Sequence, residues 1–135
     1  MEIQIRVYYE DTDCGGVVYY ANYLRWLERG RTEFLRERGI ELVSLMRRDI
    51  WFSVSECNLK YKKSAKYDDL LRVVTELEEV GGAAFWLKNY IWRKNELLVE
   101  ARVRIACMSG ETGKVKRIPA EVVEAIMAGK VPTSK

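Results

Sequence analysis

The chain has 135 residues, enough for one domain with a hydrophobic core and too few for two comfortable ones, so we expect residues 1–135 to form a single domain. Its 23 basic and 20 acidic residues give a net charge of +3, far from the basic surface of a nucleic-acid-binding protein, and no run of 18 apolar residues could span a membrane. The chain has no histidine, which excludes Ser-His-Asp and Cys-His triads and histidine-ligated metals, so an enzymatic base or nucleophile must be a carboxylate, cysteine, lysine or tyrosine.

The first segments of the chain predict a strand, a loop and the start of a helix. Residues 2–9 alternate and are rich in β-branched and aromatic side chains, which is typical of a strand. Residues 10–21 follow as a loop, in which Gly15 and Gly16 supply backbone freedom. Asn22 is the predicted N-cap of the long helix that comes next.

This long helix is predicted to be amphipathic and to end at Gly39, which takes the C′ position. Apolar side chains that we expect in the core recur along one face: Tyr23, Trp26, Leu27, Phe34 and Leu35. Gly30 interrupts the helix at a cost of about 1 kcal/mol relative to alanine. A close approach of the helix backbone to a packed sheet would explain that glycine.

The rest of the chain is dominated by segments with the composition of strands. They cover residues 51–63, 70–80, 83–92 and 97–108. Gly81-Gly82 predicts a hairpin turn between the second and third of them. Alternate residues of the last segment form an apolar row that we expect to face the core: Leu97, Val99, Ala101, Val103, Ile105 and Cys107. A hairpin turn over residues 109–114 and a short helix from Pro119 to Gly129 complete the chain.

This order of elements predicts an α+β fold, because a strand and a long helix precede a meander of about four antiparallel strands. The expected architecture is an antiparallel sheet of about five strands wrapped around one long helix. The open edges of such a sheet would invite pairing with a second copy.

The cysteines and the N-terminal residues bear on the cellular location of the protein. Cys14, Cys57 and Cys107 are odd in number and widely separated, which predicts neither a disulfide framework nor a thiolate zinc site. We expect Cys57 and Cys107 to be small core residues. Residues 1–10 lack the charged start and apolar centre of a signal peptide, so we expect a cytoplasmic protein.

Glu10, Asp11 and Asp13 form an acidic cluster just before the glycine pair. The spacing alone favours a turn or capping role for Asp13 and hydrogen-bonding or surface roles for Glu10 and Asp11. The alternative for Asp13 is a catalytic carboxylate that faces the free N–H groups at the start of the long helix.

Three motifs bear on that choice: "VYYEDTDCGGVVYYANYLRWLERGRTEFL" (7–35), "LKYKKSAKYDDLLRV" (59–73) and "KRIPAEV" (116–122). With the strand order, they resemble the 4-hydroxybenzoyl-CoA thioesterase family of the hot-dog fold, and in particular its bacterial acyl-CoA thioesterase branch associated with the Tol-Pal system. The resemblance implies hydrolysis of a short-chain aliphatic or aromatic acyl-CoA thioester, without a metal or another cofactor. It also implies a homodimer with a continuous sheet and active sites at the subunit interface, often paired into a homotetramer.

The family's site residues map onto this sequence through the first motif. Asp13 corresponds to the catalytic aspartate, acting as nucleophile or as general base, and the backbone N–H of Tyr20 to the group that polarises the thioester carbonyl. The Tol-Pal branch usually has histidine at the position of Tyr20, so the backbone donor is kept and any role of a histidine side chain is lost. Gly16, Val17 and Asn22 of this motif are also predicted to bind substrate. Because coenzyme A carries phosphates, Lys62 and Lys63 are predicted to bind it as well, with a solvated strand face as the alternative for these lysines.

Two other functions remain open at this point. The family resemblance also allows thioesters of an acyl carrier protein in place of coenzyme A esters. A non-catalytic module that binds acyl groups or partner proteins would keep the helix and sheet but would not need Asp13.

Overall fold

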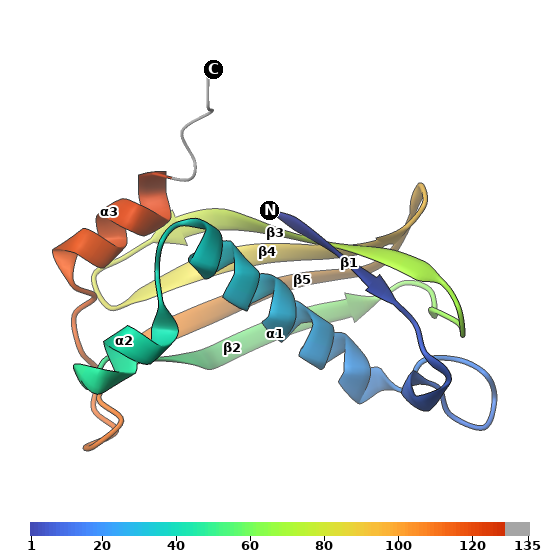
Figure 1. The fold of residues 1–135 in the computed structure, drawn as a ribbon, viewed down its shortest axis with the longest axis horizontal. Helices are drawn as coiled ribbons and strands as arrows, with labels where there is room; N and C mark the ends of the chain where they lie inside the picture. Colours follow the sequence, from blue (N-terminus) through green and yellow to red (C-terminus); the bar gives the residue numbers. More distant parts are fainter. Residues whose placement is uncertain (129–135) are drawn as a thin grey trace.

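The computed structural model describes residues 1–128 of the chain, and its fold is an antiparallel sheet with one long helix across its face (Figure 1). The elements in chain order are β1 (Glu2–Arg6), η1 (Tyr9–Asp11), α1 (Tyr20–Glu37), α2 (Leu42–Arg47), β2 (Trp51–Tyr61), β3 (Leu70–Val80), β4 (Ala84–Arg93), β5 (Glu96–Met108) and α3 (Ala120–Ala128). The α+β composition and the five strands confirm the predicted fold class. The predicted helix end at Gly129 lies outside the described residues.

The strands pair in the order β1-β3-β4-β5-β2, and every pairing is antiparallel. The hairpin at Gly81-Gly82 joins β3 to β4 as predicted, and β5 follows β4 as the next neighbour. The expected four-strand meander is wrong for β2, which crosses to the far side of β5 instead of pairing with β3. The two edges of the sheet are therefore β1 and β2.

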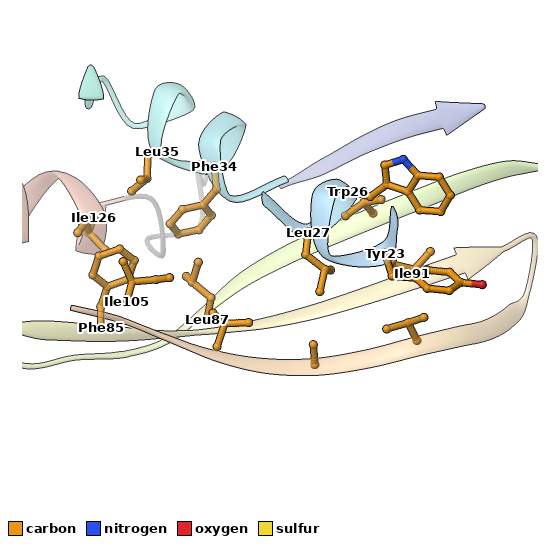
Figure 2. Close-up of a cluster of buried hydrophobic side chains, with 14 of the residues drawn as sticks. Tyr23, Trp26, Leu27, Phe34, Leu35, Phe85, Leu87, Ile91, Ile105 and Ile126 are labelled. Carbon is orange, nitrogen blue, oxygen red and sulfur yellow. The ribbon is translucent and has the colours of Figure 1, made fainter. Parts of the chain in front are cut away.

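The core lies between α1 and the sheet. Figure 2 shows side chains of α1 directed at the strands, with Leu27 and Phe34 among those facing Leu87, Phe85 and Ile105. All five apolar residues predicted for the inner face of α1 are buried. Burial of a large apolar side chain contributes about 1.5–3 kcal/mol to the free energy of unfolding. The apolar face of α1 therefore holds the helix on the sheet.

At Gly30 the backbone of α1 approaches the sheet closely. A Cβ atom at this position would lie 2.8 Å from Thr75 Oγ1 and 3.1 Å from Val73 Cγ1. Both side chains belong to β3, so the predicted close approach is confirmed. Gly39, with φ of +77°, ends the helix in a left-handed conformation, also as predicted.

Three local predictions need correction. β1 ends at Arg6, because the chain turns into the short η1 helix instead of staying extended to residue 9. In β5 the pairing register shifts opposite Ile91 and Trp92. As a result Leu98 is fully buried, whereas Leu97, the first residue of the predicted apolar row, is only partly buried. An irregularity of this kind inserts one residue and exchanges the faces of the strand.

The third correction concerns Cys57, which is exposed although Cys107 is buried as expected. Cys57 pairs with the core residue Val103 and so points to the helix side of the sheet. Its strand β2 is an edge strand, and α1 packs over β3 and β1 at the other side. The helix side of β2 is therefore left largely uncovered by residues 1–128.

We predict that Gly30→Ala destabilises the protein by about 1–3 kcal/mol, although alanine is the better helix former. The added methyl group would overlap Thr75 and Val73 and force α1 away from the sheet. Urea denaturation would measure the free energy of unfolding, with Arg29→Ala at an exposed helix position as the control. A stability equal to or above that of the wild type would contradict the close packing described above.

Candidate active site

The loop that precedes α1 folds into a tight turn around Asp13. The N–H of Gly16 donates to the carbonyl of Asp13 at 3.1 Å, and the N–H of Asp13 donates to the carbonyl of Val17 at 2.9 Å. Gly16 has φ of +83°, a conformation that glycine adopts at no steric cost. Thr12 and Val18 pair on either side of this turn, so both ends of the loop are fixed.

The carboxylate of Asp13 has one oxygen in use and one available. Oδ1 accepts a hydrogen bond of 2.8 Å from the N–H of Gly15, which is the Asx-type turn that the spacing predicted. A Cβ atom at Gly15 would lie 3.3 Å from this oxygen, so glycine allows the close contact. Oδ2 accepts no hydrogen bond from residues 1–128, and the side chain is exposed. The turn therefore fixes the carboxylate and leaves an oxygen free for chemistry.

The start of α1 has no side-chain cap. The residue at the N-cap position is Tyr19, whose side chain makes no capping hydrogen bond. The N–H groups of Tyr20 and Ala21 find no acceptor within the described part of the chain. Together with the helix dipole, these free donors make the start of α1 a place where a negatively charged oxygen is stabilised.

The predicted N-cap role of Asn22 is wrong, because the helix begins two residues earlier. Asn22 is buried, its Nδ2 donates to the carbonyl of Asp11 at 2.8 Å, and its Oδ1 accepts from Arg25 at 3.1 Å. The same carbonyl of Asp11 accepts the N–H of Tyr19 at 3.0 Å. Asn22 thus ties the acidic loop to the first turn of the helix.

The other two acidic residues of the loop have no comparable position. The carboxylate of Asp11 accepts the backbone N–H of Tyr8 at 2.8 Å and so stabilises η1, in agreement with its predicted hydrogen-bonding role. Glu10 lies exposed in the same short helix. Of the three carboxylates, Asp13 is the one placed in the turn leading to α1.

A second segment, residues 65–69, supports the loop from the side. Val18 donates its N–H to the carbonyl of Ala65 at 2.9 Å, and Val17 pairs with Lys66. The N–H of Ala65 donates in turn to the hydroxyl of Tyr23 at 2.9 Å. Burial raises the pKa of this hydroxyl. Sequence reasoning missed this contact, although residues 65–69 lie inside the second family motif.

Aromatic rings adjoin the start of α1. Tyr20 is 65% exposed, and its ring centroid lies 4.8 Å from that of Tyr61 on β2. Tyr61 in turn lies 5.3 Å from the buried ring of Tyr23. The first residue of α1 thus carries an exposed ring packed on a second partly exposed ring, and this pair would favour contact with an apolar or aromatic acyl group.

The predicted substrate-binding lysines are engaged in surface ion pairs. Lys62 lies 3.8 Å from Glu100, and Lys63 lies 2.6 Å from Glu96. Hydrogen bonds from Lys63 and Arg93 lower the pKa of Glu96 to about 2. Lys66, which pairs with Val17 through its backbone, has no carboxylate partner within residues 1–128. Of these lysines, Lys66 is therefore the one beside the Asp13 loop with its charge unpaired.

Other kinds of site find little support in the described residues. No group of three or more His, Cys, Asp or Glu residues able to hold a metal ion occurs among residues 1–128. No helix in that part of the chain is long and apolar enough to cross a membrane. What the loop and the helix combine is a carboxylate and unpaired backbone donors, the two groups that acyl transfer requires.

Comparison with known proteins gives the family. A family model described as the thioesterase-like superfamily matches residues 7–126. Over 124 residues the chain is 43% identical to the acyl-CoA thioesterase YbgC of Haemophilus influenzae, an alignment that covers 90% of each protein. The crystal structure of a probable thioesterase from Bartonella henselae is 39% identical, with a TM-score of 0.79 over 88% of this chain and 97% of that one.

A third comparison bears on the fold alone. The 4-hydroxybenzoyl CoA thioesterase from Pseudomonas sp. strain CBS-3 is 24% identical, with a TM-score of 0.84 over 93% of this chain and 97% of that structure. Together these likenesses confirm the predicted family and its hot-dog fold.

We predict that Tyr23→Phe lowers the free energy of unfolding by about 1–3 kcal/mol, because the buried N–H of Ala65 would lose its acceptor. Tyr90→Phe, which removes a hydroxyl from the half-buried outer face of the sheet, is the matched control. Thermal and urea denaturation would measure both variants. If Tyr23→Phe were as stable as the control, the hydroxyl would not be the support of the 65–69 segment.

Proposed function

The chain belongs to the thioesterase-like superfamily and is an acyl-CoA thioester hydrolase, and we propose that Asp13 and the first turn of α1 carry out the hydrolysis. The observation that carries this proposal is the uncapped start of α1, where the N–H groups of Tyr20 and Ala21 have no acceptor within residues 1–128. The acidic loop beside it is tied to the helix through Asn22 and the carbonyl of Asp11. A carboxylate and an oxyanion site are therefore held in one unit.

The proposed reaction has two possible first steps. The free carboxylate oxygen of Asp13 attacks the thioester carbon, the C–S bond breaks, and coenzyme A leaves as a thiolate, which gives a mixed anhydride that water then hydrolyses. In the second path Asp13 takes a proton from water as the water oxygen attacks the same carbon. The C–S bond then breaks, and coenzyme A leaves as the thiol with the proton that Asp13 returns. In both paths the negative charge on the carbonyl oxygen is stabilised by the N–H of Tyr20.

A thioester is reactive enough to be hydrolysed by one carboxylate and one backbone N–H. Its carbonyl is poorly stabilised by resonance and its thiolate is a good leaving group, so a single carboxylate can do what an amide bond would demand of a full triad. Tyr20 stands where the related branch usually has histidine, so this position offers no imidazole as a general base. We assign its contribution to the backbone N–H and to contact of its exposed ring with the acyl group.

The remaining predicted contacts are assigned more limited roles. We propose that the backbone at Gly16 and Val17 lines the thioester, because the turn places both residues between Asp13 and α1. Asn22 acts by holding the loop, since both ends of its amide are already bonded. Lys62 and Lys63 would approach the phosphates of coenzyme A only in competition with Glu100 and Glu96.

We further propose that the protein is a homodimer joined through β2, with a dimer of dimers as the larger assembly. On the helix side β2 presents the apolar side chain of Val54, which is 45% exposed. Tyr61 on the same side remains partly exposed, although its ring touches Tyr20 and Tyr23 of α1. Its outer edge also has unpaired backbone groups, since β2 is the last strand of the sheet. Pairing with a second β2 would satisfy these groups and bury the apolar side chains.

The cysteines bear on the cellular location, and the reacting groups bear on the alternative functions. All three cysteines are free thiols, which fits a reducing compartment and supports a cytoplasmic location. A thioester of an acyl carrier protein could enter the same site, because the reacting atoms are identical. A purely binding module would not need a carboxylate fixed beside an uncapped helix.

We predict that Asp13→Asn lowers kcat for acyl-CoA hydrolysis by at least about 1000-fold, because the amide can neither attack nor take a proton efficiently. Thiol release from a panel of short aliphatic and aromatic acyl-CoAs would be followed with a thiol reagent. Cys14→Ser, at the adjacent exposed position, is the control and should retain wild-type turnover. Equal turnover by Asp13→Asn and the wild type would leave Asp13 as a turn residue only.

The proposed dimer predicts that Val54→Lys yields a monomer, because a charge would replace an apolar group on the uncovered side of β2. Met127→Lys, at a comparably exposed apolar position on α3, should keep the wild-type mass. Size-exclusion chromatography with light scattering would measure all three proteins. A wild-type mass for Val54→Lys would place the subunit interface elsewhere.

A further inference from the structure

Tyrosine side chains gather around the candidate site. Six of the eight tyrosines are exposed. Besides Tyr20 and Tyr61, which adjoin the start of α1, the most exposed is Tyr9 in η1, at 78%. Tyr9 lies against Tyr67, which is 57% exposed and follows Lys66, the backbone partner of Val17. Proposed catalysis through Asp13 and the start of α1 does not use this second aromatic pair.

Tyr9 and Tyr67 form the walls of a shallow surface hollow that Tyr8 also lines. Their ring centroids are 5.9 Å apart and the planes meet at 89°. In a perpendicular pair of this kind the edge of one ring meets the face of the other, and the corner beside this contact is bordered by a face of each ring. A flat aromatic ring can stack on the first and make an edge contact with the second.

The backbone under this pair is fixed from both sides. In the Tyr9 segment, Asp11 donates its N–H to the carbonyl of Tyr8, and Thr12 donates to the carbonyl of Tyr9 through both its N–H and its hydroxyl. In the Tyr67 segment, Asp68 donates its N–H to the carbonyl of Val7 at 2.9 Å. The two rings thus stand on segments that are bonded to each other, so little backbone freedom remains to be lost on binding.

The charges around the hollow select the kind of ring. Glu10 and Asp68 also line it, and Arg6 is 4.0 Å from Asp68. Carboxylates repel a phosphate but accept a hydrogen bond from an exocyclic amino group, such as the N6 amine of adenine. Lys66 precedes Tyr67 in the chain and pairs through its backbone with Val17 of the Asp13 loop. Its ammonium has no carboxylate partner among residues 1–128, so it would attract a phosphate.

We propose that Tyr9 and Tyr67 bind the adenine base of the coenzyme A substrate, with Lys66 facing its phosphates. This inference rests on the proposed function, because it places the nucleotide relative to a thioester held at Asp13. Tyr9 is four residues from Asp13, so their Cα atoms are at most about 14 Å apart. The extended pantetheine arm joins the thioester to the nucleotide across a separation of this order. The site would therefore favour coenzyme A esters over thioesters of a carrier protein, which has no adenine at the end of its arm.

The test compares one acyl group on coenzyme A with the same acyl group on pantetheine, which lacks the nucleotide. Tyr9→Leu and Tyr67→Leu should each raise KM for the acyl-CoA about ten-fold and leave KM for the acyl-pantetheine and both kcat values near wild type. Tyr9→Phe keeps the ring and should restore the wild-type KM. Tyr90→Leu, on the outer face of the sheet, is the matched control and should change neither KM.

A second readout uses adenosine 3′,5′-bisphosphate as a competitive inhibitor, which should bind about ten-fold more weakly to Tyr9→Leu than to the wild type. Equal KM changes with both substrates, or no change with either, would overturn the adenine site. A lower oligomeric mass of Tyr9→Leu would also overturn it and make the hollow a subunit contact. Failure of the wild type to hydrolyse either substrate would instead reject the proposed function, and the adenine site with it.

Discussion

The unsatisfied start of α1 is the constraint on which the rest of the structure depends. A helix whose first N–H groups have no cap gives up about 1 kcal/mol or more of local stability, so its position must be secured by other contacts. In this chain the buried face of α1 does so, together with the close approach of Gly30 to Thr75 and Val73. Packing along the helix thus leaves its end free to bind an oxyanion.

In the Asp13 loop, too, some groups hold the structure while others remain free for the reaction. One carboxylate oxygen closes the turn with Gly15, and the other is free. Asn22 and the 65–69 segment hold the loop against the helix by backbone and side-chain hydrogen bonds. The two initial interpretations of Asp13, a turn residue and a catalytic residue, are therefore compatible, because each uses a different oxygen.

Features set by local chemistry could be predicted from the sequence, whereas those set by pairing across the fold could not. The inner face of α1, the role of Gly30, the end at Gly39 and the Gly81-Gly82 turn follow from periodicity and glycine conformation. The crossing of β2 to the far side of β5 and the register shift beside Leu98 depend on which strands meet, which periodicity does not encode. Asparagine is a common N-cap residue, yet the Asn22 side chain donates a hydrogen bond to the carbonyl of Asp11, eleven residues away. The support of Val18 by Ala65 is equally non-local.

The central claim is that the N–H at residue 20 stabilises the oxyanion. Replacing Tyr20 with its α-hydroxy acid analogue would turn this amide into an ester and remove the N–H while keeping the side chain. No residue of the described chain accepts this hydrogen bond, so the substitution should affect folding stability only by weakening the Tyr19 carbonyl, which accepts the N–H of Asn22 at 2.9 Å. Our account predicts that kcat for acyl-CoA hydrolysis falls about 100- to 1000-fold with little change in KM. An unchanged kcat in the folded ester variant would contradict it.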